Sequence, residues 1–272
     1  MKNTLFTLLI LTISSLTFGQ KTTDYEKIIY SSPENIDEAD YSISFKNIVS
    51  TSEYCKLAIT ISNKTDDILL FTPKNGSFNF EFGSRNPSTK EFYIMPNDSK
   101  TKTLTVNGGN DFLQEKFNLK LGVLVKIPTD EMVVETPNFI VPATKNSFST
   151  GDFNVVLKKY TASTKEAKAV FECTYTGSKI AVVNPSLLSI QAKRKKTDEL
   201  VVYANDNKKS EPTPLKNGEK LKITAVFHIQ GKIVDMQFAT MEILWNDTFV
   251  VTEPISFPLQ EVNFEIDKSL SE

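Results

Sequence analysis

The chain has 272 residues, of which 40% are hydrophobic and 24% are charged. This composition is typical of a globular protein and excludes both a disordered chain and one filled with membrane spans. With 31 basic and 33 acidic residues, the formal charge of −2 gives no reason to expect a nucleic acid or an anionic membrane as partner. One histidine and two cysteines are too few for an ordinary zinc, copper or haem site, so we expect no metal and no cofactor.

Residues 1–19 have the three parts of a secretory signal peptide. Lys2 is followed by the apolar stretch 5–13 and by a small-residue ending at Gly19. Cleavage there leaves a mature chain beginning at Gln20, with no cysteine to accept a lipid. No apolar stretch reaches the roughly 20 residues that span a bilayer, so we expect no transmembrane anchor. The sequence therefore predicts a periplasmic or secreted protein.

The segment 20–40 is acidic and shows little alternation, which predicts a flexible leader. From Tyr41 onward, apolar residues alternate with polar ones, as in strands with one buried face. Such runs include Ile43 and Phe45; Leu57, Ile59 and Ile61; Phe78, Phe80 and Phe82; and Leu119, Leu121 and Val123. Turn-forming residues separate the runs, and no stretch of ten residues is convincingly helical. We therefore predict an all-β fold of antiparallel sandwiches.

The polar, aperiodic segment 142–151 predicts a linker between two sandwiches, at 41–141 and 152–265, followed by a C-terminal tail at 266–272. A shift of 112 residues superposes the apolar patterns of the two halves, for example Ile43 on Val155, Ile61 on Cys173 and Pro73 on Pro185. Further along, the shift grows by about ten residues and places Leu119 over Met241. We expect the extra length in the loop 205–217.

This arrangement resembles secreted bacterial proteins with tandem immunoglobulin-like domains, of a Bacteroidota-like type whose function is uncharacterised. The resemblance rests on the alternating cores and on three motifs, namely Asn63-Lys64-Thr65, the glycine-rich 107–110 and Leu244-Trp245-Asn246-Asp247. The signal-peptide ending Phe18-Gly19-Gln20 points to the same group. The resemblance implies two tandem immunoglobulin-like β-sandwiches after a cleaved signal peptide, and it assigns no chemistry.

Three residues are the first candidates for chemistry. Cys55 and Cys173 share the inward parity of their strands, one in each half, which favours two buried free thiols over an interdomain disulfide or a nucleophile. His228 lies on the polar face of the run 221–229, so an exposed strand residue is favoured over a general base. No hydrolase or phosphate-binding motif is present, so we expect no catalytic residues and no enzyme.

Aromatic and acidic residues offer two further readings. Trp245, Tyr93, Tyr160 and Tyr203 could form a platform for sugars, but Trp245 has the parity of Met241 and Ile243, which favours a core position. The acidic pairs Asp66-Asp67 and Asp198-Glu199 could act as glycosidase carboxylates, but connections between strands commonly carry such solvated pairs.

The strongest local charge feature is the basic run Lys193-Arg194-Lys195-Lys196, with Lys208 and Lys209 in the loop that follows. It is interpreted either as a solvated edge that discourages sheet-to-sheet aggregation or as a docking surface for an acidic partner or for lipid headgroups. We predict a non-catalytic extracytoplasmic protein that binds another envelope or extracellular protein through this surface, through its loops or by strand addition. The alternatives are a module that binds polysaccharide or a small ligand and, less favoured, an enzyme.

Overall fold

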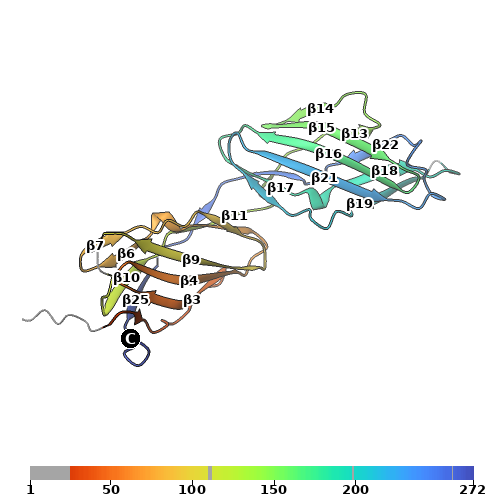
Figure 1. Ribbon diagram of the computed structural model, residues 1–272. Coiled ribbons are helices and arrows are strands. Elements are labelled where there is room, and N and C mark those ends of the chain that lie inside the picture. The colour runs from red at the N-terminus through yellow and green to blue at the C-terminus, as the bar shows by residue number, and fades with distance from the viewer. Residues whose placement is uncertain (1–24, 110–111, 198, 259) are drawn as a thin grey trace, which may run out of the picture.

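The computed structural model describes residues 25–109, 112–197, 199–258 and 260–272. The predicted signal peptide therefore lies outside the described residues. Within them the chain forms strands and two short 3-10 helices, η1 (Pro73–Asn75) and η2 (Pro185–Leu187), and no α-helix. The strands form antiparallel sheets that build two sandwiches, joined into an elongated molecule (Figure 1). The predicted all-β fold class is confirmed.

The first sandwich packs one sheet against two shorter ones. The first sheet has the order β1 (Ile28–Ile29), β3 (Tyr41–Ser50), β4 (Tyr54–Asn63) and β9 (Ser99–Asn107), and β2 (Ile36–Asp37) also pairs with β3. The facing layer contains β25 (Glu261–Glu265), β10 (Lys116–Lys120), β6 (Ser77–Phe80) and β7 (Gly83–Arg85), continued by β24 (Ile255–Ser256), β11 (Val123–Ile127), β5 (Ile68–Thr72) and β8 (Phe92–Ile94). The alternating residues of both layers point inward and form one hydrophobic core rich in phenylalanine.

The second sandwich repeats this plan. Its first sheet has the order β14 (Ser147–Thr150), β15 (Phe153–Ala162), β16 (Glu166–Tyr175) and β21 (Lys220–His228). The facing layer contains β13 (Phe139–Val141), β22 (Met241–Leu244), β18 (Ser189–Lys193) and β19 (Leu200–Ala204), continued by β12 (Met132–Val133), β23 (Phe249–Thr252), β17 (Ile180–Val183) and β20 (Thr213–Leu215). Its core is separate from that of the first sandwich and contains Trp245, 1% exposed.

The strand register confirms the predicted 112-residue repeat in the first half of each sandwich. Ile43 lies opposite Ile61 in the first sandwich, and Val155 lies opposite Cys173 in the second. The bulge that interrupts β3 after Lys46 also recurs in β15, after Leu157. Two sequences with few identities therefore encode the same strand pairing.

Later in the repeat, the predicted register is wrong by two residues. Leu119 lies opposite Phe78, and the residue opposite Ile190 is Ile243 rather than Met241. Because Phe78 and Ile190 are 112 residues apart, Ile243 is the counterpart of Leu119. Met241 and Ile243 are two positions apart and face the same side of the sheet, so an alternation pattern alone does not distinguish them.

The second sandwich is inserted between β11 and β24 of the first, and here the structure differs from the predicted boundaries. The strands β12 and β13, which precede the predicted linker, pair with β23 and β22 of the second sandwich. The strands β24 and β25, predicted within the second sandwich, instead pair with β11 and β10 of the first. The predicted linker 142–151 contains β14, so the chain crosses between the sandwiches at 128–131 and again at 253–254. Alternation in a strand does not identify its partner, which explains the error.

The predicted leader and tail are also part of the first sandwich. β1 and β2 pair with β3, and Ile28 and Tyr30 are buried in the core. At the C-terminus, the backbone of Glu272 exchanges two hydrogen bonds with that of Lys27, at 2.9 and 3.0 Å. The prediction of a flexible leader is therefore wrong for the described residues from Tyr25 onward, because local composition does not report these distant pairings.

A third apolar cluster joins the two sandwiches. It contains Ile68 and Leu70 of β5, Ile127 of β11, Val182 of β17 and Val250 of β23, all at most 6% exposed. In β5, β17 and β23 the neighbouring residues face the core of their own sandwich, so these three segments are buried on both faces. This explains why β5 and β17 are continuous apolar runs rather than alternating ones.

Polar contacts surround this cluster. Glu131 Oε2 accepts hydrogen bonds from Thr252 Oγ1 (2.6 Å) and from the Glu253 N–H (3.0 Å), which joins the two crossing segments. An ion pair between Lys216 and Glu91 links the second sandwich to the first. We infer that two crossings, an apolar contact and these polar contacts together restrict the relative motion of the sandwiches.

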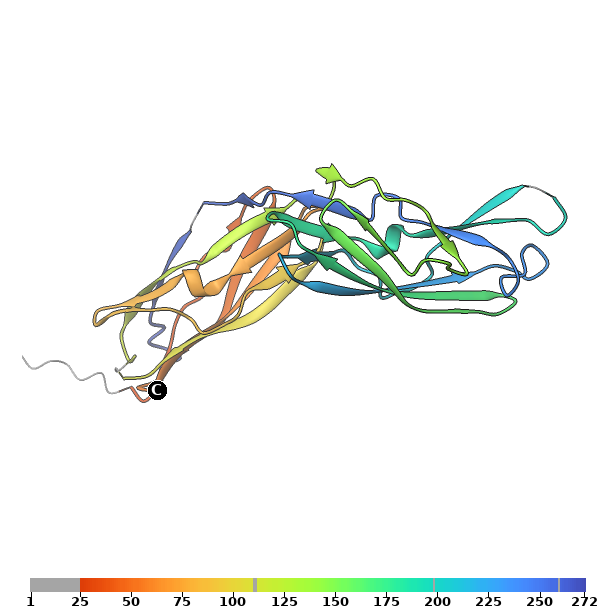
Figure 2. The same cartoon turned by 90° about the horizontal axis from the view of Figure 1, so that it is seen from above.

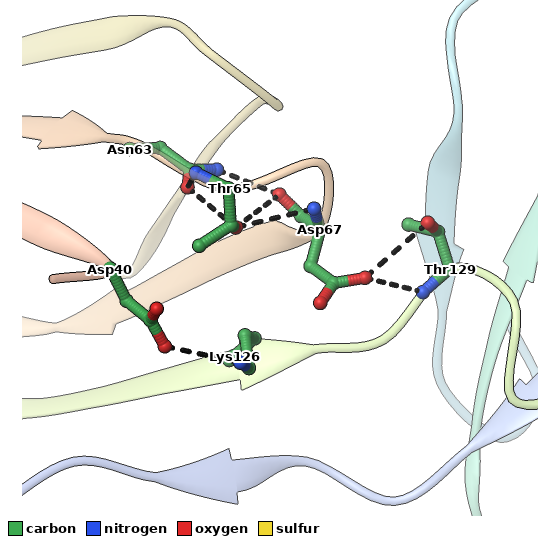
Figure 3. A network of polar contacts seen from close by, with 6 residues as sticks. All are labelled: Asp40, Asn63, Thr65, Asp67, Lys126 and Thr129. Atoms are coloured by element: carbon green, nitrogen blue, oxygen red, sulfur yellow. Dashed lines mark hydrogen bonds and ion pairs between the residues drawn. The ribbon is translucent and has the colours of Figure 1, made fainter.

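The turn Asn63-Lys64-Thr65, which the sequence analysis marked as a motif, organises the first crossing (Figure 3). The buried Asn63 side chain donates to the carbonyl of Asp67 (2.7 Å) and accepts from the N–H (3.0 Å) and hydroxyl (2.8 Å) of Thr65. Asp67 Oδ1 in turn accepts from the Thr129 N–H at 3.0 Å. Nearby, Lys126 pairs with Asp40 at 3.1 Å. The motif is therefore a structural device that holds the chain where it leaves the first sandwich.

The return of β25 to the first sandwich leads to a test by mutation of Phe264 in that strand. This side chain is 1% exposed and stacks on Phe117, with ring centroids 4.7 Å apart. Phe264→Ala should destabilise the first sandwich by about 3–5 kcal/mol because it opens a cavity in that core. Thermal unfolding followed by circular dichroism should therefore show an early transition that Trp245 fluorescence, a probe of the second sandwich, does not follow. The outward-facing neighbour Asn263→Ala is the control, and an early loss of Trp245 fluorescence in Phe264→Ala would contradict the assignment of β25 to the first sandwich.

Candidate functional site

The candidate surface lies at the end of the second sandwich that points away from the first (Figure 2). It is formed by the hairpin between β18 and β19 and by the connection 230–240 between β21 and β22. The two are fastened together by Lys195, whose N–H donates to the Ile233 carbonyl at 2.8 Å and whose Nζ lies 3.5 Å from the Asp235 carboxylate. We call this region the distal end.

The four basic residues of the predicted run lie in this hairpin. Lys193, Lys195 and Lys196 are exposed, and Arg194 is partly buried. The Arg194 Nε lies 3.0 Å from the Glu199 carboxylate, in an ion pair whose orientation does not make a hydrogen bond. The ion pairs of Arg194 and Lys195 are at least partly solvated, so we expect each to contribute little to stability.

The basic residues occupy lengths of chain that the first sandwich lacks. The offset between equivalent residues is 112 for Phe78 and Ile190, but it is 118 for their partners Arg85 and Tyr203. Six of the twelve extra residues that precede Ile243, the counterpart of Leu119, therefore lie in the hairpin, and not where they were expected in the loop 205–217. A smaller increase, to 121, follows in the loop that carries Lys208 and Lys209, as the equivalent partners Tyr93 and Pro214 show.

Lys208 and Lys209 lie beyond the other end of β19, so the structure separates them from the hairpin run. Lys209 lines a groove of about 460 Å³ beside β21, together with Lys168 and Lys222 of the sheet and Glu211. Within the described part of the chain, Lys208 and Lys209 form no ion pair. The predicted basic residues thus form two groups, one at each end of β19, and the sheet adds cations that the sequence analysis did not include.

The distal end also has an apolar component, which the sequence patterns did not predict. Phe238 is 81% exposed at the end of the connection 230–240, while its neighbours Val234 and Met236 are buried. Aromatic side chains are enriched in interfaces between proteins, so Phe238 is a candidate contact residue. The signal in the sequence is a phenylalanine between polar residues in a segment without alternation, and only the structure shows which side chains of this segment are buried.

His228 lies between two carboxylates on the outer face of the same sandwich. Its Nδ1 is 2.9 Å from Asp206 Oδ2 and its Nε2 is 3.1 Å from Glu166 Oε2. The hydrogen bond to Asp206, followed by that to Glu166, raises the pKa of the imidazole above its ordinary value. The predicted exposed position is confirmed, because 52% of the side chain is exposed. Among the described residues, no cluster of histidine, cysteine and carboxylate side chains is arranged to hold a metal ion.

The two cysteines are buried free thiols in separate cores, as predicted. Burial raises the pKa of both Cys55 and Cys173 to about 12, so neither is a thiolate near neutral pH. Cys173 lies opposite Leu221, seven register positions from the pair formed by Glu166 and His228, which is about 23 Å along the strand. The structure therefore does not bring a thiol and the histidine together.

The structure also places the other candidates. Trp245 is a core residue, which confirms the favoured reading and removes it from any sugar platform. Tyr160 and Tyr203 are partly buried against the same core. Of the acidic pairs, Asp67 holds Thr129 and Glu199 pairs with Arg194, whereas Asp198 lies outside the described residues.

Comparisons with known proteins add little to this geometry. Neither a protein-family model nor a curated protein sequence matches the chain. Among solved structures, the C-terminal globular domain of an oligosaccharyltransferase from Pyrococcus abyssi is similar over 89% of this chain, with 11% sequence identity and a TM-score of 0.16. This chain covers 48% of that protein. In the described segments, no helix is long and apolar enough to cross a membrane.

The two carboxylates beside His228 lead to a prediction about pH. Because the folded pKa is raised above the unfolded value of about 6.5, the stabilisation by His228 is full below that value and is lost as pH rises through the folded pKa. The unfolding free energy lost in His228→Gln should therefore be larger at about pH 5.5 than at about pH 8.5. Urea unfolding followed by Trp245 fluorescence measures the difference, and an equal loss at both pH values would exclude a charged imidazole in this contact.

Proposed function

We propose that this chain is a non-catalytic binding protein of the periplasm or cell exterior, which presents the distal end of its second sandwich to another protein. The observation that carries the proposal is the composition of the distal end, which combines the exposed Phe238 of the connection 230–240 with the basic run 193–196 of the hairpin. Interfaces between proteins combine an apolar centre with a charged rim in this way. The predicted signal peptide supports the location.

The arrangement of the molecule supports the same proposal. The distal end lies at the opposite end of the elongated body from Lys27 and Glu272, whose backbones are hydrogen-bonded to each other (Figure 1). Loops held at the end of a well-packed sandwich are typical positions for binding residues. The two crossings and the apolar cluster at the junction would hold the distal end at a fixed distance from the first sandwich.

Affinity capture with the tagged mature chain from its own envelope fraction tests the proposal. The combined change of Lys193, Arg194, Lys195 and Lys196 to serine should leave folding nearly intact, because exposed charges contribute little to stability. It should slow association with the captured partner by about tenfold at low salt, and added salt should weaken wild-type binding.

A control with the same change in charge replaces Lys46, Lys74, Lys90 and Lys102, four exposed lysines of the first sandwich, by serine. This variant should bind like the wild type. An equal loss in both variants would mean that overall charge matters rather than the distal end. No loss in either would remove the basic run from binding, and capture that survives protease treatment of the envelope fraction would indicate a polysaccharide instead of a protein.

A further inference from the structure

We propose that β19 accepts an extended segment of another protein as an additional strand of its sheet, a segment with alternating apolar residues between flanking carboxylates. This inference rests on the proposed function, because it specifies how the distal end would bind its partner. It depends on which backbone groups of β19 face the open edge, on the side chains of this strand and on the charges at its two ends.

β19 is an outer strand. The sheet has the order β13, β22, β18 and β19, so β19 pairs with β18 alone. Residues of antiparallel partners alternate between pairs that exchange hydrogen bonds and pairs that do not. The N–H of Arg194 donates to the Glu199 carbonyl (2.9 Å), and at the other end the N–H of Asn205 donates to the Leu188 carbonyl (2.9 Å). These two bonds determine which residues of β19 form hydrogen bonds with β18 and which do not.

Given these two bonds, Val201 and Tyr203 are the residues of β19 that exchange hydrogen bonds with β18. Leu200, Val202 and Ala204 therefore direct their N–H and carbonyl groups away from β18, toward the open edge. In the described part of the chain, no backbone hydrogen bond from another segment reaches these three residues. They form a row of donors and acceptors with the spacing that an incoming strand requires.

The side chains of β19 are suited to the same role. Leu200 and Val202 are each 54% exposed, and the strand has no charged residue and no proline. Natural proteins commonly protect such an edge with lysine, proline or a covering loop. The contrast with the other outer strands of this molecule shows that this protection is absent only here among the described edges of five or more residues.

The edges β9 and β25 carry both kinds of protection. β9 includes Lys100 and Lys102, and the N–H of Ser88 donates to its Thr105 carbonyl. β25 begins and ends with glutamate, and the N–H of Ser31 donates to the carbonyl of its last residue, Glu265. Both strands are therefore charged, and each already has a backbone partner outside its sheet.

The edge β21 is covered by the loop that follows β19. The Asp206 N–H donates to the Val226 carbonyl (2.8 Å), and the Asn207 side chain donates to the Thr224 carbonyl (2.8 Å). Lys220 and Lys222 add charge to this strand. The same loop that closes β21 thus leaves β19 open.

The basic residues at the two ends of β19 indicate the charge of the segment that would pair with it. Lys193–Lys196 precede β19, and Lys208 and Lys209 follow it, so an added strand would meet cations at both of its ends. Carboxylates on either side of an apolar core would complement this arrangement. A second copy of this chain fits less well, because antiparallel pairing of two β19 strands would bring the hairpin cations of one copy near Lys208 and Lys209 of the other.

Amide hydrogen exchange of the full mature chain tests this inference, with a synthetic peptide as probe. The peptide alternates valine and threonine between glutamates at both ends. In the free protein, the amides of Val201 and Tyr203 should exchange slowly, and those of Leu200, Val202 and Ala204 should exchange fast. The peptide should slow the exchange of these three amides by about tenfold or more, since each gains a hydrogen-bond partner or is shielded from water by the peptide. Binding that leaves them fast, or no binding, would overturn the inference.

The matched variants are Val202→Pro and Val202→Thr. Proline removes only an N–H that points to the open edge, a position where edge strands tolerate it, whereas threonine keeps both the amide and the branched side chain. Unchanged Trp245 fluorescence and slow exchange at Val201 verify folding. Val202→Pro should weaken peptide binding by at least about tenfold, while Val202→Thr should bind like the wild type. Equal binding by both variants would contradict strand addition.

Two further comparisons separate this inference from the proposed function. A control peptide with lysines in place of the glutamates should bind more weakly, and equal binding would contradict the selection by charge. If the peptide fails while envelope capture still depends on the basic run 193–196, strand addition is wrong and the proposed function stands. If the peptide protects β19 while capture does not depend on the distal end, the edge accepts a strand but the proposed function is wrong.

Discussion

The whole architecture depends on the contact between the outer faces of β5 and β11 in the first sandwich and of β17 and β23 in the second. Leu70 and Val182, which are 112 residues apart, both belong to this contact. Their strand partners, Val125 in β11 and Val250 in β23, belong to it as well. Equivalent positions of the two repeats thus meet each other, as in an isologous dimer. Without this contact, five buried aliphatic side chains would face water, and the two crossing segments would be the main remaining connection.

The insertion of the second sandwich into the first strengthens that contact in a second way. The chain forms the whole second sandwich from β12 to β23 and then returns with β24 and β25 to complete the first. The core of the first sandwich includes Val262 and Phe264 from the end of the chain. Neither the junction nor the first sandwich is therefore complete until nearly the whole sequence has been made. The distal end is the part of the molecule that remains available for binding.

Local patterns in the sequence predicted the features that depend on neighbouring residues, namely the strands and the direction in which their side chains face. Alternation gave the strands, the inward parity of Cys55, Cys173 and Trp245, and the 112-residue repeat. The unbroken apolar runs in β5 and β17 contained the signal of the junction, because a strand that is apolar at every position is buried on both faces. The partner of β24 and β25, the pairing of His228 with Asp206 and Glu166, and the exposure of Phe238 all depend on contacts between distant segments, which no periodicity reports.

Because the contact at the junction holds the distal end relative to the first sandwich, the most direct measurement is nitrogen-15 relaxation by nuclear magnetic resonance on the mature chain. The rotational correlation times obtained from strand amides of β3, β4 and β9 should agree with those from β15, β16 and β21, when both sets are fitted to one elongated body. Separate, shorter correlation times for the two sandwiches would contradict the account, since they would show that the apolar cluster and the double crossing do not hold the molecule together.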